Sequence, residues 1–153
     1  MANPDAIKTL VELSSREVDE QAKRLGIAMR AQAEQEEKLA LLSQYRDDYA
    51  NRCQTNLCNG LSNTDYQNYR TFLNKLDEAI AGQHEVIKAA TYKVNHEKNN
   101  WQAAERKRMS FDVLAQRTQQ QAQHLAAKRE QKETDEYANR AFANKMYHAN
   151  RTE

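Results

Sequence analysis

A seven-residue repeat of apolar side chains between Tyr66 and Ala104 is the feature that most constrains how this chain folds. Such a long repeat predicts a helix packed against another helix, because 3.5 residues per turn keep the apolar positions on one side. Between Tyr66 and Phe111 proline is absent and Gly82 is the only glycine, so nothing interrupts the helix strongly. Two rows make up the repeat: Tyr66, Leu73, Ile80, Ile87, Val94 and Trp101, and Tyr69, Leu76, Gln83, Ala90, Glu97 and Ala104, of which only Gln83 and Glu97 are not apolar.

The N-terminal part of the chain carries a second apolar stripe. Asn3 suits a helix cap, Pro4 the first helical position and Asp5 the positive end of the helix dipole. The stripe predicts one helix from about Asn3 to about Thr55, although it thins between residues 32 and 38. Its members are Ile7, Leu10, Val11, Leu13, Val18, Ala22, Leu25 and Met29, followed by Leu39, Leu42, Tyr45 and Tyr49.

A turn is predicted between the two stripes, at about residues 56–61, where Asn59 and Gly60 stand together. Ser62, with Asp65 three residues later, resembles a capping box and predicts a second helix over about 62–147. A short loop between two long helices gives an antiparallel hairpin, in which Tyr45 lies opposite Phe72. We therefore predict a single all-α domain over 1–153, a long antiparallel two-helix coiled-coil hairpin whose arms are unequal and whose second helix overhangs at the C-terminus.

Composition narrows the class of partner. The 153-residue chain is 29% charged and 39% hydrophobic, as suits long exposed helices that bury a narrow stripe. A net charge of +1 argues against nucleic acid, because phosphate contacts need concentrated Lys and Arg. No apolar run approaches the ~20 residues that span a membrane. We therefore expect a cytoplasmic protein with no direct membrane insertion.

No pattern in the sequence indicates catalysis. The four histidines are scattered along the chain, and neither a phosphate-binding glycine loop nor a nucleophile motif is present. We predict that the protein is not an enzyme and uses no cofactor or metal. Cys53 and Cys58 have a spacing that matches no common zinc or redox pattern, and we expect two inert thiols.

Apolar residues near the turn exceed what a narrow hairpin needs. Two rows at helical spacing face the same flank under the predicted pairing, and they allow two interpretations. One is a locally wide core, and the other is an exposed docking patch, since contiguous exposed apolar area usually marks an interface. The rows are Lys38, Leu42, Tyr45 and Tyr49 on the first helix, and Phe72, Leu76, Ala79 and Gln83 on the second.

These residues, taken in order, resemble the FliJ family of flagellar export proteins. The resemblance covers nearly the whole chain and includes the turn, Trp101 and elements of the C-terminal tail. The residues that carry it are Leu10, Leu13, Glu17, Val18, Asp19, Ala22, Leu25, Gly26, Leu42, Tyr45, Tyr49, Asn59, Gly60, Tyr69, Phe72, Leu76, Ala79, Ile80, Trp101, Lys132, Asp135, Glu136, Ala138, Arg140 and Ala141.

The resemblance implies a soluble component of the flagellar type III export apparatus, peripheral to the inner membrane at the flagellar base. It implies a stalk-like coiled coil that binds the ring of the export ATPase, contacts the cytoplasmic part of the export gate protein and interacts with export chaperones. The gate contact maps to Leu42, Tyr45, Tyr49, Phe72, Leu76, Ala79 and Gln83, while Lys38 replaces the glutamine expected there. The ATPase contact maps loosely to Leu13, Glu17, Asp19, Lys132, Asp135, Glu136 and Arg140.

Two alternatives stay open at the level of the sequence. The chain could be the equivalent stalk or chaperone of a virulence type III secretion system. The genes beside its own gene, flagellar or injectisome, would distinguish the two systems. It could also be a generic coiled-coil scaffold. With the resemblance included, we favour the docking interpretation of the flank near the turn.

Overall fold

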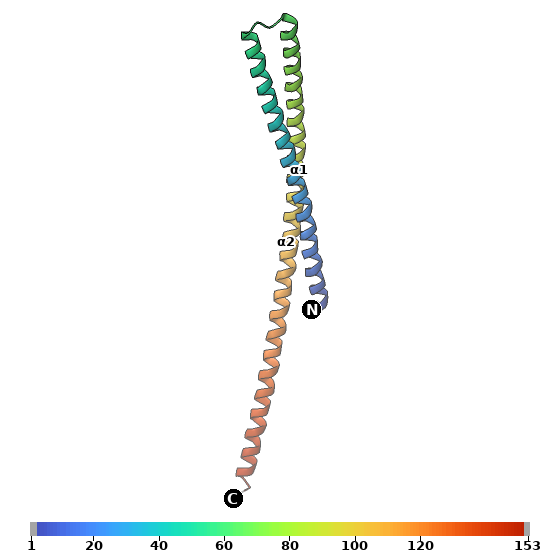
Figure 1. The fold of residues 1–153 in the computed structure, drawn as a ribbon. Helices are drawn as coiled ribbons and strands as arrows, with labels where there is room; N and C mark the ends of the chain where they lie inside the picture. Colours follow the sequence, from blue (N-terminus) through green and yellow to red (C-terminus); the bar gives the residue numbers. More distant parts are fainter. Residues whose placement is uncertain (1–2, 152–153) are drawn as a thin grey trace. The chain divides into compact units, whose positions relative to one another are not determined.

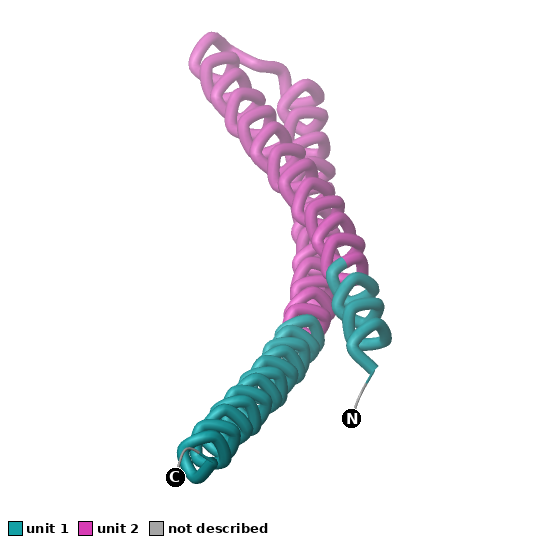
Figure 2. Tube along the Cα trace, turned by 90° about the horizontal axis from the view of Figure 1, so that it is seen from below, with its two compact units in different colours: residues 1–15, 106–153 teal, residues 16–105 magenta. Residues whose placement is uncertain are grey.

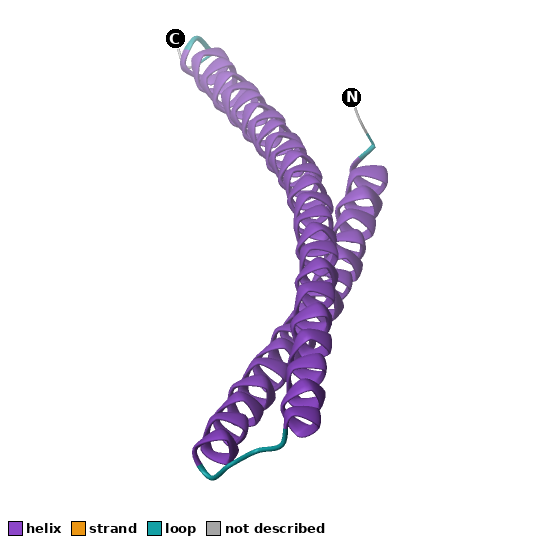
Figure 3. Ribbon diagram, turned by 90° about the horizontal axis from the view of Figure 1, so that it is seen from above, coloured by secondary structure: helices purple, strands orange, loops and turns teal. Residues whose placement is uncertain are grey.

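A computed structural model describes residues 3–151 of the chain. Two α-helices, α1 (Pro4–Cys58) and α2 (Asn63–Ala149), account for its regular structure, and the described residues contain no strand (Figures 1 and 3). The predicted all-α class is confirmed. Both helices run further than predicted, α1 past Thr55 to Cys58 and α2 past residue 147 to Ala149.

The helix starts follow from local capping chemistry. The side-chain Oδ1 of Asn3 accepts a hydrogen bond from the backbone N–H of Asp5 at 3.1 Å. Ser62 Oγ accepts from the backbone N–H of Asp65 at 3.2 Å and donates to the Asp65 carboxylate at 2.6 Å. Gly60 adopts a φ of +88°, which favours glycine because it has no Cβ. Each cap satisfies a backbone donor that the first turn of a helix leaves unpaired.

The helices contribute to two compact units, which Figure 2 shows in different colours. The hairpin unit comprises Arg16–Glu105 and contains the turn. The terminal unit comprises the residues up to Ser15 together with those from Arg106 onward. Each unit is described in turn.

In the hairpin unit, α1 and α2 lie antiparallel and side by side on either side of the turn (Figures 1 and 3). Buried and half-buried side chains recur along α1 at alternating steps of three and four residues, which is the spacing of a coiled-coil seam. On α2 the seam consists of the two predicted rows, whose members are buried or half-buried except Tyr66, which is 36% exposed. The α1 seam is Val18, Gln21, Leu25, Ala28, Gln32, Gln35, Leu39, Leu42, Arg46, Tyr49, Cys53 and Asn56.

The predicted apolar stripe of α1 is therefore wrong in part. Met29 is 54% exposed, and the neighbouring Ala28 is 3% exposed in its place. Ala22 is also exposed, while the polar Gln21 lies on the seam. Burial on α1 follows the alternating three- and four-residue spacing of the seam. Side chains at these positions face α2 and are buried or half-buried whether or not they are apolar. The seam consequently continues through residues 32–38, where the apolar stripe thins.

Side-chain size varies along the hairpin unit. Ala28 and Ala90 occupy the middle of the seam, whereas Tyr49 and Tyr69 occupy it near the turn, with the half-buried Phe72 beside them. Interhelical distance depends on the side chains at the contact. The helices accordingly lie farther apart near the turn than in the middle of the unit (Figure 1), and aromatic rings fill the additional space.

In the terminal unit, the first three turns of α1 pack on α2. Ile7 and Ser14 are each 3% exposed, and Ser14 Oγ donates to the Val11 carbonyl at 2.9 Å. Leu10 and Leu13 are 40% and 54% exposed, so these two members of the predicted stripe do not pack between the helices. From Gln121 to Ala149 every residue of α2 is exposed. Neither helix of the described chain contains an apolar stretch sufficient to cross a bilayer.

Candidate docking surfaces

Aromatic rings near the turn form a contiguous cluster in the hairpin unit. The ring of Tyr49 lies 4.5 Å from that of Phe72 and 5.0 Å from that of Tyr69, measured between centroids. Tyr45 meets Phe72 edge-on at 6.3 Å, as the predicted pairing requires. Asn56 Nδ2 donates to the Tyr69 hydroxyl at 2.7 Å. Burial, followed by the neighbouring Tyr69, raises the pKa of the Tyr49 hydroxyl.

The structure divides the predicted gate-binding patch between seam and surface. Leu76 is 8% exposed and lies in the seam, whereas Tyr45 is 52% exposed and Ala79 is exposed as well. Lys38 is also exposed. The remaining members, Leu42, Tyr49, Phe72 and Gln83, are half-buried. The two interpretations of this flank thus apply to different residues: Leu76 stabilises the helix pair, and Tyr45 offers an aromatic surface.

Polar side chains in the seam form hydrogen bonds between the helices that the sequence interpretation missed. Gln83 Nε2 donates to both the backbone carbonyl and the side-chain oxygen of Gln35, each at 2.9 Å. Gln32 Nε2 donates to Thr91 Oγ1 at 3.0 Å. Two of these residues lie where the apolar stripe of α1 thins. Extending the three-and-four spacing of Leu25 and Leu39 through the gap would have placed Gln32 and Gln35 on the seam.

An ion pair between Arg46 and Asp77 also joins the two helices of the hairpin unit. Arg46 Nε donates to Asp77 Oδ1 at 2.9 Å, and this bond raises the pKa of the Arg46 guanidinium. Asp77 lies further along α2 than the predicted pairing would put the partner of Arg46.

Two acceptors in the seam have no hydrogen-bond partner: Gln21 Oε1 and Glu97 Oε2 are both buried. Gln21 precedes Gln35 on α1 by two heptads, and Glu97 follows Gln83 on α2 by two heptads. In an antiparallel seam, the Gln35–Gln83 bond therefore puts Gln21 across from Glu97. The Glu97 carboxylate offers only acceptors, so the Gln21 amide is the side-chain donor of this pair of residues, and leaving the two oxygens unpaired disfavours their burial.

The predicted ATPase-facing residues fall into both units. Leu13, 54% exposed, belongs to the terminal unit, while Glu17 is half-buried and Asp19 exposed in the hairpin unit. The other four are exposed on α2 in the terminal unit, and their spacings of three and four residues put them on one helix face. This tail face consists of Lys132, Asp135, Glu136 and Arg140.

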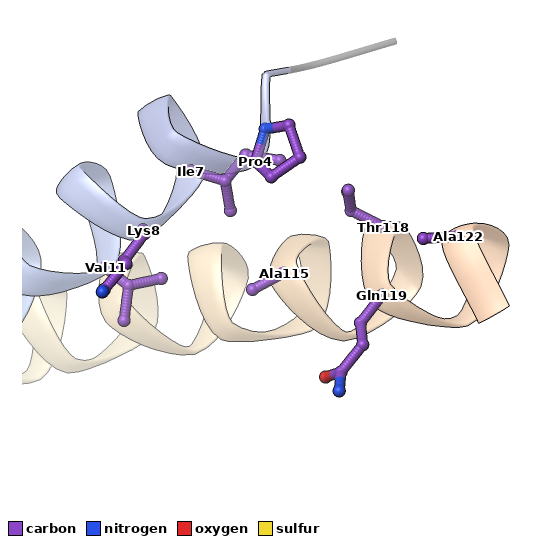
Figure 4. A pocket seen from close by; sticks show the side chains of 8 residues that line it. All are labelled: Pro4, Ile7, Lys8, Val11, Ala115, Thr118, Gln119 and Ala122. Carbon is purple, nitrogen blue, oxygen red and sulfur yellow. The ribbon is translucent and has the colours of Figure 1, made fainter.

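A groove of about 400 Å³ lies where the start of α1 meets α2 in the terminal unit. In Figure 4, Pro4 and Ile7 of α1 lie above Ala115 and Thr118 of α2. The small side chains of Ala115 and Ala122 leave this space next to the end of α1. Beyond it, α2 continues with no packing partner in the described chain.

Comparison with known proteins gives the family. The model of the flagellar FliJ protein family matches residues 4–147, which is nearly the whole of both helices. The chain belongs to the FliJ family. A flagellar FliJ protein of Escherichia coli (strain K12) is 32% identical over 146 residues, covering 95% of this chain and 99% of that protein. A flagellar FliJ protein of Salmonella typhi is 30% identical over 145 residues, with coverage of 95% and 99%.

The family resemblance expected from the sequence is thereby confirmed. Membership of the FliJ family assigns the chain to flagellar export by type III secretion rather than to a generic coiled-coil scaffold. The two long helices of the structure agree with a coiled-coil member of this family.

Proposed function

We propose that this flagellar export component is a non-catalytic subunit that binds the export ATPase and links it to the cytoplasmic part of the export gate. Export chaperones are its third class of partner, and it acts at the cytoplasmic side of the inner membrane. The observation that supports the proposal is the presence of two different exposed surfaces. One is the aromatic surface of the hairpin unit around Tyr45, and the other is the tail face of α2.

The tail face is proposed to bind the export ATPase. Every residue from Gln121 to Ala149 is exposed, and a helix without a packing partner is marginal in water. The tail therefore gains stability from any partner that covers it. Its charged residues are of both signs, with Lys132 and Arg140 on either side of Asp135 and Glu136. Such a face suits a partner surface with complementary charges, which fix register more than affinity.

A charge-reversal experiment tests the tail face. The purified protein should hydrolyse no ATP alone and should stimulate its ATPase partner by promoting ring assembly. The double substitution Lys132→Glu, Arg140→Glu should weaken that stimulation. The control is Lys145→Glu, which reverses a charge at an exposed position of the same helix away from the tail face. Stimulation by the double variant equal to that by the control would remove the tail face from the contact.

The surface around Tyr45 is proposed to dock on the export gate. Tyr45→Ser should weaken binding to the cytoplasmic part of the gate, retain ATPase binding and keep the melting temperature nearly unchanged, since the side chain is 52% exposed. Tyr92→Ser is the control, because Tyr92 is 75% exposed on α2 of the same unit. Gate binding that survives Tyr45→Ser and also the double variant Tyr45→Ser, Phe72→Ser would rule out this surface.

A further inference from the structure

A second periodic stripe runs along α1 in the hairpin unit, outside the seam. It extends from Glu20 to Arg52 at alternating steps of four and three residues, and all ten of its positions are exposed. We call it the outer stripe. Its large apolar members Ile27, Leu41 and Tyr45 are 61%, 60% and 52% exposed. Ala31 is its fourth apolar member, and the other six positions are charged. Exposed apolar area on one face usually marks an interaction surface, and the spacing of the stripe suits another helix.

The outer stripe is self-complementary about a point midway between Glu34 and Lys38. When a second copy of the stripe is laid antiparallel across this point, Glu34 of each copy faces Lys38 of the other. One step outward, Ala31 faces Leu41. The next step brings Ile27 opposite Tyr45, so apolar residues meet on both sides of the central charges.

The ends of the stripe continue the same complementarity with charges. In the same antiparallel register, Arg24 faces Asp48 of the second copy and Glu20 faces Arg52 of the second copy. A parallel, in-register pair would instead bring Glu34 against Glu34 and Lys38 against Lys38. Like charges across an interface are strongly disfavoured, so the stripe selects the antiparallel arrangement.

The surface shape follows the same symmetry. One shallow hollow of about 240 Å³ is lined by Ile27, Arg30, Ala31 and Glu34. Another of about 330 Å³, on the other side of the midpoint, is lined by Leu41, Gln44, Tyr45 and Asp48. In the antiparallel register, the hollow beside Ile27 of one copy faces Leu41 and Tyr45 of the second copy. The hollow beside Tyr45 likewise faces Ile27 and Ala31 of the second copy. This reciprocal fit is what a two-fold symmetric interface requires.

We propose that the outer stripe binds the outer stripe of a second copy of the chain, forming an antiparallel, two-fold symmetric homodimer through α1. The homodimer leaves the tail face free but shares Tyr45 with the gate contact proposed above. Because Tyr45 belongs to the stripe, a chain in the homodimer has this ring covered. A dimerised chain is therefore not available for gate docking through Tyr45.

Charge reversal and charge swap in the full-length protein test the homodimer by sedimentation equilibrium. Glu34→Lys alone places Lys against Lys twice in each dimer, and Lys38→Glu alone places Glu against Glu twice. Each single variant should weaken the dimerisation constant by about tenfold or more, because two favourable ion pairs become two repulsions. The double variant Glu34→Lys, Lys38→Glu restores opposite charges at both positions and should dimerise like the unmodified protein.

Controls separate this interface from general charge effects and from unfolding. Glu37→Lys and Lys23→Glu make the same changes at exposed positions of α1 outside the outer stripe, and both should leave dimerisation unchanged. Circular dichroism melting identifies any variant that fails to fold. A protein that remains monomeric up to about 1 mM, the limit of weak association, would overturn the proposal. So would a dimer that ignores both single reversals, or a double variant that stays as weak as the single ones.

Discussion

The helices of residues 16–105 and of residues 121–149 both combine many polar residues with some apolar ones, but only those of residues 16–105 pack on another helix. In the hairpin unit a seam of buried and half-buried residues repeats along both helices. Between Gln121 and Ala149 every side chain is exposed, including Leu125, Tyr137 and Phe142, which are 43%, 77% and 66% exposed. The difference shows that apolar residues in a helix stabilise the fold only when a second helix covers them, since helix propensity alone supplies little stability.

The largest expected change in stability comes from replacing a seam leucine of the hairpin unit with alanine, compared with the same replacement in the exposed part of α2. Leu76→Ala, in the seam of the hairpin unit, should lower the free energy of unfolding by about 2–4 kcal/mol, because it removes buried methyl groups and leaves a cavity. Leu125→Ala, on the exposed part of α2, should change it by less than about 0.5 kcal/mol. Urea denaturation followed by circular dichroism measures both. Equal effects would show that the tail is packed in solution.

A gain in stability is expected at the polar layer of Gln21 and Glu97. Glu97→Gln supplies an amide donor for Gln21 Oε1, which has no partner in the native protein, and resembles the bonded Gln35–Gln83 layer. The free energy of unfolding should rise by about 1–2 kcal/mol, the cost of leaving a buried polar group unpaired. Glu130→Gln, at an exposed tail position, is the control and should have almost no effect. A destabilised Glu97→Gln protein would mean that the carboxylate is already satisfied in solution.

A smaller loss is expected at the helix start beside the turn. Ser62→Ala removes the cap that accepts from the Asp65 backbone N–H and should cost about 1 kcal/mol. The control is Ser110→Ala in the terminal unit, where the hydroxyl bonds the Arg106 carbonyl inside a helix. Alanine is the better helix former there, so thermal unfolding should be unchanged or slightly shifted upward. A cap variant as stable as the control would show that tertiary packing alone holds the start of α2.

The smallest effect is expected from deletion of the unpacked part of α2. A chain that ends at Lys128 lacks residues 129–149 of α2, all of which are exposed. Its total helical signal should fall, while amide protection in the hairpin unit should change by less than about twofold in rate, equivalent to ~0.4 kcal/mol. Hydrogen exchange read by mass spectrometry checks this. Loss of amide protection around Leu76 would show that the deleted part of α2 does stabilise the hairpin unit.

The seam of α2 was predictable because its own residues repeat every seven positions. Tyr69, Leu76 and Ala104 share one row, and the structure buries or half-buries all three. The seam of α1 was less predictable, since polar residues such as Gln32 and Gln35 occupy seam positions and apolar ones such as Met29 do not. The three-and-four register sets which residues of α1 lie on the seam, and hydrogen bonds to α2 satisfy Gln32 and Gln35 there. A search for apolar residues alone misses such polar seam positions.

The sequence by itself determined the two helices, the turn with its Ser62 cap and the FliJ family, because these depend on local spacing, capping chemistry and residue order. The tertiary structure decided which residues are seam and which are surface. Leu76 and Tyr45 are two members of one predicted patch, but Leu76 lies in the contact between the helices and Tyr45 is exposed to solvent. The physical reason is that exposure depends on the register of one helix against the other. A shift of less than one helical turn moves a side chain from the contact to the solvent.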